Sequence, residues 1–105
     1  MTKVEVMAGP CKFKTTILAQ KEGRKNVKLD IATECPHYEN LAKELTEVDA
    51  YVELLGAKGE PSVKKTVEKY SKHITCPVAL AILKAVEVEA GLALGVEPWV
   101  KIEKN

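Results

Sequence analysis

The first third of the chain alternates polar and apolar residues, which is the pattern of half-buried β-strands. The alternation runs through residues 3–7, 12–20 and 27–33, and its period is two because successive strand residues point to opposite faces of a sheet. Between the second and third runs lies the segment KEGRKN, in which Gly23 suits a tight turn. The pattern therefore predicts an antiparallel hairpin, with residues 3–7 as a third strand.

After Cys35 the spacing of the apolar residues changes to three and four, which is typical of one face of an α-helix. The residues that share this face are Tyr38, Leu41, Ala42, Leu45, Val48, Val52 and Leu55. Thr46 and Asp49 have the spacing of a capping box, so we expect the span to divide into two helices there. The segment GAKGEPS at 56–62 ends this pattern, and Pro61 fits the opening turn of a third helix.

The last third of the chain predicts one long helix and one short strand. Thr75 is expected to cap a helix that runs from Cys76 to about Leu92, and the apolar first part of this helix favours a central, buried position. Residues 98–104, PWVKIEK, are expected to form a strand at the edge of the sheet. The element order predicts an α+β fold in a single domain over residues 1–105. It would have a three-stranded antiparallel sheet, extended by this C-terminal strand, with three or four helices on one face.

Composition narrows the classes of function. The 105 residues are 46% hydrophobic and 30% charged, with a net charge of +1, so we expect no general attraction to nucleic acid or to a membrane surface. The longest apolar run, VALAIL, is too short to span a bilayer. An odd number of cysteines, three, and no export signal at the start of the chain favour a reducing compartment. The sequence therefore predicts a cytoplasmic protein.

Each of the three cysteines stands beside a proline at a predicted element boundary. Cys11 follows a Gly-Pro pair in the turn after the first strand, and Cys35 and Cys76 each precede a proline at the start of a helix. The unpaired N–H groups at a helix start favour the thiolate, which is the form that binds metals and carries sulfur. A free cysteine is also a common small buried hydrophobe. Placement alone leaves both interpretations open.

The layout of these cysteines resembles the iron–sulfur cluster assembly scaffold family, IscU and the N-terminal domain of NifU. In that family one ligand cysteine lies between the first two strands, a second follows the third strand, and a third opens the final long helix. Cys11, Cys35 and Cys76 fall at similar places, separated by 24 and 41 residues. The resemblance implies that these three residues bind an iron–sulfur cluster or Zn²⁺, and that the protein is not an enzyme. A cysteine desulfurase or an apo-protein acceptor is the implied partner.

The chain departs from the family pattern around two of these cysteines. Lys12 and Phe13 follow Cys11 where the family has Gly and Asp, and Thr75 stands where the family has a histidine before the third cysteine. The segment YSKHI replaces the family's chaperone-recognition motif. His73 is therefore the preferred fourth ligand and His37 the alternative, because three thiolates and one imidazole form an ordinary tetrahedral set.

Two other functions compete with the scaffold. One is a thiol-based sulfur-transfer or redox protein, in which one reactive cysteine forms a persulfide or a mixed disulfide. The other is a partner-binding domain whose cysteines are structural. The scaffold hypothesis makes a geometric prediction: the sulfur atoms of Cys11, Cys35 and Cys76 should lie within roughly 10 Å of one another, partly accessible, at one end of the sheet. His73 or His37 should be close enough to join them.

Overall fold

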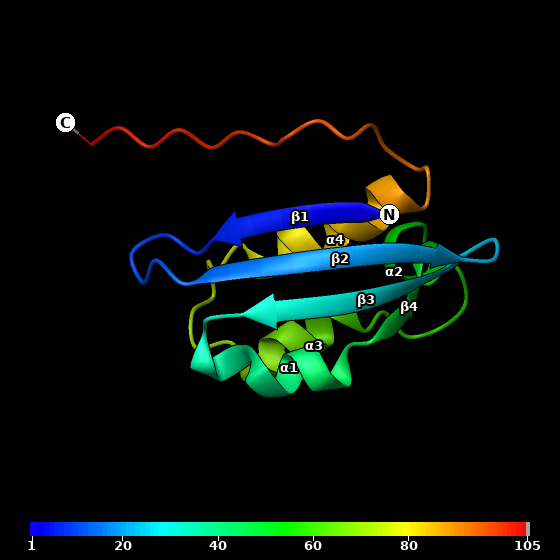
Figure 1. Ribbon diagram of the computed structural model, residues 1–105, viewed down its shortest axis with the longest axis horizontal. Coiled ribbons are helices and arrows are strands. Elements are labelled where there is room, and N and C mark those ends of the chain that lie inside the picture. The colour runs from blue at the N-terminus through cyan, green and yellow to red at the C-terminus, as the bar shows by residue number, and fades with distance from the viewer. Residues whose placement is uncertain (105) are drawn as a thin grey trace.

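Four antiparallel strands form one sheet in the order β1-β2-β3-β4, and helices cover one of its faces (Figure 1). The structure is a computed structural model that describes residues 1–104. The strands are β1 (Thr2–Met7), β2 (Lys14–Glu22), β3 (Asn26–Thr33) and β4 (Glu47–Asp49). The α+β class, the antiparallel sheet and the first three strands agree with the prediction from hydrophobic periodicity.

The hairpin of β2 and β3 supplies the apolar floor of the core. Ile17 of β2 pairs with Ile31 of β3, and Ala19 pairs with Leu29, so side chains of the two strands meet on the buried face. Alternate residues of β3 are exposed, as expected for a sheet with one face toward solvent. Gly23 adopts a φ of +75° in the connecting turn, where a residue with a Cβ would be strained.

The fourth strand comes from a segment that the sequence predicted as helix. Residues 47–49 pair with β3, with Val48 opposite Val27, and Leu29 N–H donates to Thr46 O at 2.8 Å. Val48 is buried in the core, which is the position that its place in the helical pattern also requires. Burial of Val48 is therefore compatible with a helix and with a strand, and the open edge of β3 decided for the strand. Leu45 lies outside the strand, as the C-cap of α1 (Glu39–Glu44).

Short helices flank β4 on both sides. A 3₁₀ turn η1 (Pro36–Tyr38) leads into α1 (Glu39–Glu44), and α2 (Ala50–Leu54) follows the strand. Thr46 does not cap a helix as predicted. Asp49 is the N-cap of α2, and its carboxylate accepts hydrogen bonds from the N–H groups of Tyr51 and Val52 at 2.9 and 3.3 Å.

Helix α3 (Val63–Tyr70) begins two residues later than Pro61, which lies just before its N-cap Ser62. A carboxylate from another helix satisfies its first N–H groups. The Glu53 carboxylate accepts hydrogen bonds from Ser62 N–H and from Val63 N–H, the latter at 2.7 Å. A negative charge at this end also interacts favourably with the helix dipole.

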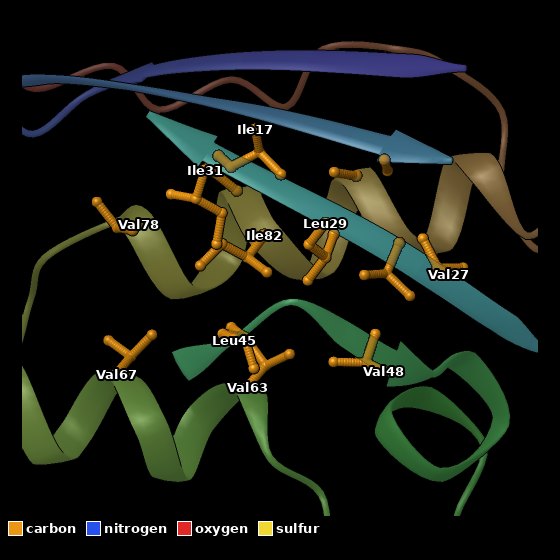
Figure 2. Close-up of a cluster of buried hydrophobic side chains, with 14 of the residues drawn as sticks. Ile17, Val27, Leu29, Ile31, Leu45, Val48, Val63, Val67, Val78 and Ile82 are labelled. Atoms are coloured by element: carbon orange, nitrogen blue, oxygen red, sulfur yellow. The ribbon is translucent and has the colours of Figure 1, made fainter. Parts of the chain in front are cut away.

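Helix α4 (Val78–Glu89) is the central helix, and it packs against β1 and β2. It is shorter than the predicted span from Cys76 to Leu92, and its N-cap is Pro77 rather than Thr75, because the chain before it forms a turn. Gly91, with a φ of +78°, follows its last turn. Figure 2 shows Ile82 of α4 facing the side chains of β2 and β3, with α3 and β4 closing the other side of the core.

The C-terminal residues differ from the prediction. Residues 98–104 form no strand in the described chain, and most of their apolar side chains are exposed, including Trp99 and Ile102. The segment leaves the end of α4 and runs extended in the same direction as β1, without joining the sheet (Figure 1). It forms no strand pair with β1. The alternation of polar and apolar residues in this segment was therefore not enough to make it a strand of the sheet. Over residues 1–104, no helix is long and apolar enough to cross a membrane.

Candidate functional site

All three cysteines and both histidines line one pocket. The pocket has a volume of about 170 Å³ and lies where the β1–β2 loop, the β3–η1 junction and the α3–α4 loop meet. Its lining residues that bear on the chemistry are Cys11, Cys35, Cys76, His37, His73 and Tyr38. We call this the thiol pocket. The three cysteines are free thiols, of which Cys11 is exposed and the other two are partly buried.

Cys11 is presented by a tight loop between β1 and β2. Ala8 N–H donates to Phe13 O at 3.2 Å and Lys12 N–H donates to Gly9 O at 2.9 Å, so the loop closes on itself. Gly9 and Lys12 both have positive φ angles, +86° and 58°, and a left-handed backbone is uncommon for a residue such as lysine. These contacts turn the chain back on itself and leave Cys11 exposed at the rim of the pocket.

Cys35 stands at the end of β3 and is the N-cap of η1. Its N–H donates to Thr33 Oγ1 at 3.1 Å, and Thr33 Oγ1 lies 2.8 Å from Thr15 Oγ1 across the strand pair. Its carbonyl accepts a hydrogen bond from Tyr38 N–H at 3.0 Å. The Thr15–Thr33 pair thus ties the position of Cys35 to the central hairpin.

Cys76 lies in the loop between α3 and α4, two residues before the first residue of α4. Its N–H donates to His73 O at 3.3 Å. Ser71 holds the same turn from the other side, because its hydroxyl donates to His73 O at 2.8 Å and accepts from His73 N–H at 3.2 Å. Cys76 and His73 are therefore carried by one turn.

Tyr38 places a buried phenol in the lining of the thiol pocket. Its side chain is only 2% exposed. Burial raises the pKa of Tyr38 to about 12, and interactions with the thiols of Cys76 and Cys35 add to the rise, while the Ser71 hydroxyl acts in the opposite direction. The phenol therefore stays neutral in the neighbourhood of Cys76 and Cys35. The sequence placed Tyr38 on a helix face; its position three residues after Cys35 is the signal that could have linked it to the thiols.

The side chains are not yet arranged as a metal centre. Within residues 1–104, no three His, Cys, Asp or Glu side chains are grouped so that they could hold one metal ion. A second hollow of about 390 Å³ adjoins the thiol pocket and shares His73 and Cys76 with it. Closing the thiols around one ligand would require rotamer changes and a shift of the loops that carry them.

The structure brings together every residue that the sequence proposed for the site. Cys11, Cys35, Cys76, His37 and His73 come from three separate loops, and their partial accessibility agrees with the expectation. The separation of the sulfur atoms stays a prediction. Sequence reasoning missed the second set of lining residues, which are Tyr38, Ser71, Lys72 and Thr15.

Comparison with known proteins adds one family. The profile of a family described as "Family of unknown function (DUF6951)" matches residues 2–102. No curated protein matches the chain, and no solved structure does.

Proposed function

The chain belongs to the DUF6951 family, and we propose that it is a scaffold or carrier that binds an iron–sulfur cluster, or zinc in its place, in the thiol pocket. One observation carries the proposal: three free thiols and two imidazoles, distant in sequence, line the same pocket. A structural role for the cysteines would not require them to converge. The role is one of binding and handing on cargo, not of turnover.

The donor set fits this cargo. Thiolate is the soft ligand that iron–sulfur clusters and zinc prefer, and imidazole can complete the set. Cys11, Cys35 and Cys76 would supply the thiolates, and His73 would supply the fourth ligand, with His37 as the alternative. His73 is favoured because its turn also carries Cys76.

The surroundings of the thiols suit a negatively charged cargo. Lys72 lines the pocket and Lys12 is the neighbour of Cys11, and an ammonium group near thiolates offsets their mutual repulsion. Tyr38 can donate its phenolic proton toward sulfur, since the raised pKa keeps it protonated. Cys11 is exposed, so a sulfur donor such as a cysteine desulfurase, or an apo-protein acceptor, could reach the site from solvent.

The fold of the loops favours release as well as binding. Each thiol sits on a loop rather than in the middle of a helix or strand, and loop ligands adjust more readily than ligands on regular elements. A site that is not preformed also binds more weakly than a preformed one, because the ordering of the loops reduces the net free energy of binding. Both properties are suited to a carrier that must pass its cargo on.

Anaerobic reconstitution with iron and sulfide tests the proposal. We expect visible charge-transfer absorption and bound iron and sulfide in the wild-type chain, with loss of both in Cys11→Ser, Cys35→Ser and Cys76→Ser. His73→Ala should weaken binding more than His37→Ala. Lys58→Ser is the matched control, because Lys58 is exposed and does not line the pocket.

Zinc binding gives a second measurement that does not depend on cluster assembly. Competition with a chromophoric chelator should give a Zn²⁺ stoichiometry of about one per chain, as for a single tetrahedral site, and each Cys→Ser variant should bind more weakly. Absence of both cluster and zinc from the wild-type chain would refute the scaffold. So would full binding by any of the three cysteine variants.

Sulfur transfer is the second candidate, and the exposed Cys11 favours it. In this function the thiolate of Cys11 attacks the outer sulfur of a donor persulfide, R–S–SH. A new S–S bond forms at Cys11, the donor S–S bond breaks, and the donor leaves as the thiolate R–S⁻. Treatment with a small-molecule persulfide followed by intact-mass spectrometry should then show the gain of one sulfur atom, lost only in Cys11→Ser. If Cys11 gains a sulfur atom and reconstitution with iron and sulfide gives no chromophore, the protein is a carrier of persulfide sulfur and not a cluster scaffold.

A further inference from the structure

Strand β1 is an open edge of the sheet. The sheet order gives it β2 as its only neighbour within the described chain, so the outer edge of its backbone has no partner strand. Along β1, Val4 and Val6 pack against the core, while Lys3, Glu5 and Met7 are exposed. An uncovered edge of this kind is a template for another strand.

The C-terminal segment has the composition of such a strand. Residues 99–103 are extended and exposed; the exposed fraction is 82% for Trp99 and 87% for Ile102. Apolar Val100 and Ile102 alternate with Lys101 and Glu103, which is the pattern of a strand with one buried face. Its five residues match the usual length of a strand.

One antiparallel register matches β1 and this segment on both faces. It places Val100 opposite Val6 and Ile102 opposite Val4. The apolar residues then extend the face of the sheet against which α4 packs. On the outer face the same register pairs Lys101 with Glu5, Glu103 with Lys3, and Trp99 with Met7. Opposite charges and apolar pairs directly across a strand pair both stabilise it.

Other registers lose this match. A shift by one residue turns Val100 and Ile102 to the outer face. A shift by two residues brings Lys101 opposite Lys3 in one direction and Glu103 opposite Glu5 in the other. A parallel arrangement that keeps the faces matched retains at most one pair of opposite charges. Charge complementarity thus selects the antiparallel register.

The direction of the chain then identifies the partner. Glu89 at the end of α4 accepts a hydrogen bond from Thr2 Oγ1 at 2.7 Å, so the chain that follows α4 sets out from beside the start of β1. From there it runs in the same direction as β1 (Figure 1), which is opposite to the direction that the register requires. A second copy of the chain, related by a twofold axis, can present its segment in the antiparallel sense.

We propose that residues 99–103 of each chain add as a strand to the β1 edge of a second copy, so that two copies form a symmetric dimer by exchanging their C-terminal segments. The ten residues that follow Glu89, 90–99, can reach about 30 Å when extended, which is enough to cross to a neighbouring sheet edge. The exchange buries Val100 and Ile102, whose exposure in the single chain is otherwise unexplained. This inference does not depend on the function of the thiol pocket.

A charge-exchange experiment tests the proposal in solution. Light scattering after gel filtration should give the wild-type chain a mass twice that of one 11.5 kDa chain. The tail variant, Lys101→Glu with Glu103→Lys, and the edge variant, Lys3→Glu with Glu5→Lys, should each be monomeric, because each places like charges opposite one another. An equimolar mixture of the two variants should form a heterodimer, since both of its interfaces regain opposite charges.

Each outcome decides for or against the exchange. A wild-type chain that stays monomeric at high concentration overturns the proposal, as does a tail variant that remains dimeric. If both variants are monomeric and their mixture stays monomeric, the segment pairs with its own chain or with nothing, and the exchange is again overturned. Substitutions in the exposed segment leave the folded part of the chain intact, and circular dichroism checks the edge variant.

Fluorescence provides an independent readout. Trp99 is the single tryptophan of the chain and lies opposite Met7 in the proposed register. Its emission should move to shorter wavelength as the wild-type concentration rises, because pairing removes the indole from water. In the tail variant the emission should be independent of concentration. Concentration-dependent emission in the tail variant would contradict the proposed register.

Discussion

Helix α4 meets the sheet in two different ways at its two ends. At the C-terminal end one carboxylate ties three segments together: Glu89 accepts hydrogen bonds from Thr2 Oγ1 at 2.7 Å and from Lys21 N–H at 2.8 Å, and lies 3.5 Å from the N-terminal amine. At the N-terminal end the helix emerges from a loop beside three free thiols. Hydrogen bonds to a charged group are roughly twice as strong as neutral ones.

The two ends of α4 therefore have different roles: the C-terminal end stabilises the fold, and the N-terminal end can adapt to a ligand. The Glu89 side chain is only 10% exposed and has a donor for each carboxylate oxygen, so this end has one well-defined arrangement. At the other end the turn that carries Cys76 and His73 is held by neutral, local contacts among Ser71, His73 and Cys76. Loops held by neutral contacts can rearrange around a ligand while the far end of the helix stays fixed.

The largest effect is expected from removing the carboxylate at the fixed end. Glu89→Ala should lower the free energy of unfolding by about 2 kcal/mol, because two hydrogen bonds to a charged group are lost. Glu87→Ala is the matched control on the same helix; its partly exposed pair with Lys84 should contribute no more than about 0.5 kcal/mol. Urea denaturation measures both. If both variants lose the same free energy of unfolding, the Glu89 carboxylate is not a special anchor of this end of α4.

Acid should weaken the same contact. Hydrogen bonds from Lys21 N–H and Thr2, together with the N-terminal charge, hold the pKa of Glu89 below its ordinary value of 4.5 against the opposing effect of burial. Because the folded-state pKa is the lower one, the contribution is fully present above pH 4.5 and is lost as the pH falls through the folded-state value. The stability difference between wild type and Glu89→Gln should therefore shrink on acidification. A difference that is constant down to pH 3 would contradict this assignment.

At the pocket end the anchor of Cys35 should matter less. Thr33→Val removes the acceptor of Cys35 N–H and the partner of the buried Thr15 hydroxyl, and should cost about 1 kcal/mol, as for neutral hydrogen bonds. The control is Thr16→Val, at the β2 residue next to Thr15. Its free energy of unfolding should be within about 0.5 kcal/mol of wild type. In Thr33→Val the Cys35 thiol should also react faster with a disulfide reagent. An unchanged rate would mean that Thr33 does not position Cys35.

The smallest effect at neutral pH is expected for the pocket phenol. Tyr38→Phe should change stability by less than about 1 kcal/mol at pH 7, because one neutral hydrogen-bonding group is removed. In wild type the folded-state pKa of about 12 exceeds the ordinary value of 10, so stability from Tyr38 is complete below pH 10 and is lost as the pH rises toward 12. The stability advantage of wild type over Tyr38→Phe should fall over this range in urea denaturation. Tyr51→Phe is the control, and an equal change in both variants would refute the special position of Tyr38.

The sequence by itself determined the strands of the hairpin and the identity of the thiol residues. Alternation in β2 and β3 has only one solution that buries Ile17, Leu29 and Ile31 on the same face, so local pattern sufficed. The cysteines were recognisable because each stands at an element boundary beside a proline, and such boundaries are visible locally.

Tertiary structure alone decided the segments whose pattern had two solutions. Val48 could be buried from a helix or from a strand, and β4 formed because the edge of β3 offered hydrogen bonds to residues 47–49. Residues 98–104 alternate like a strand, yet they have no partner edge within the described chain. A strand requires a second strand to pair with, and no local pattern states whether one is present. The same is true of the thiol pocket, which exists only because three distant loops meet at one end of the sheet.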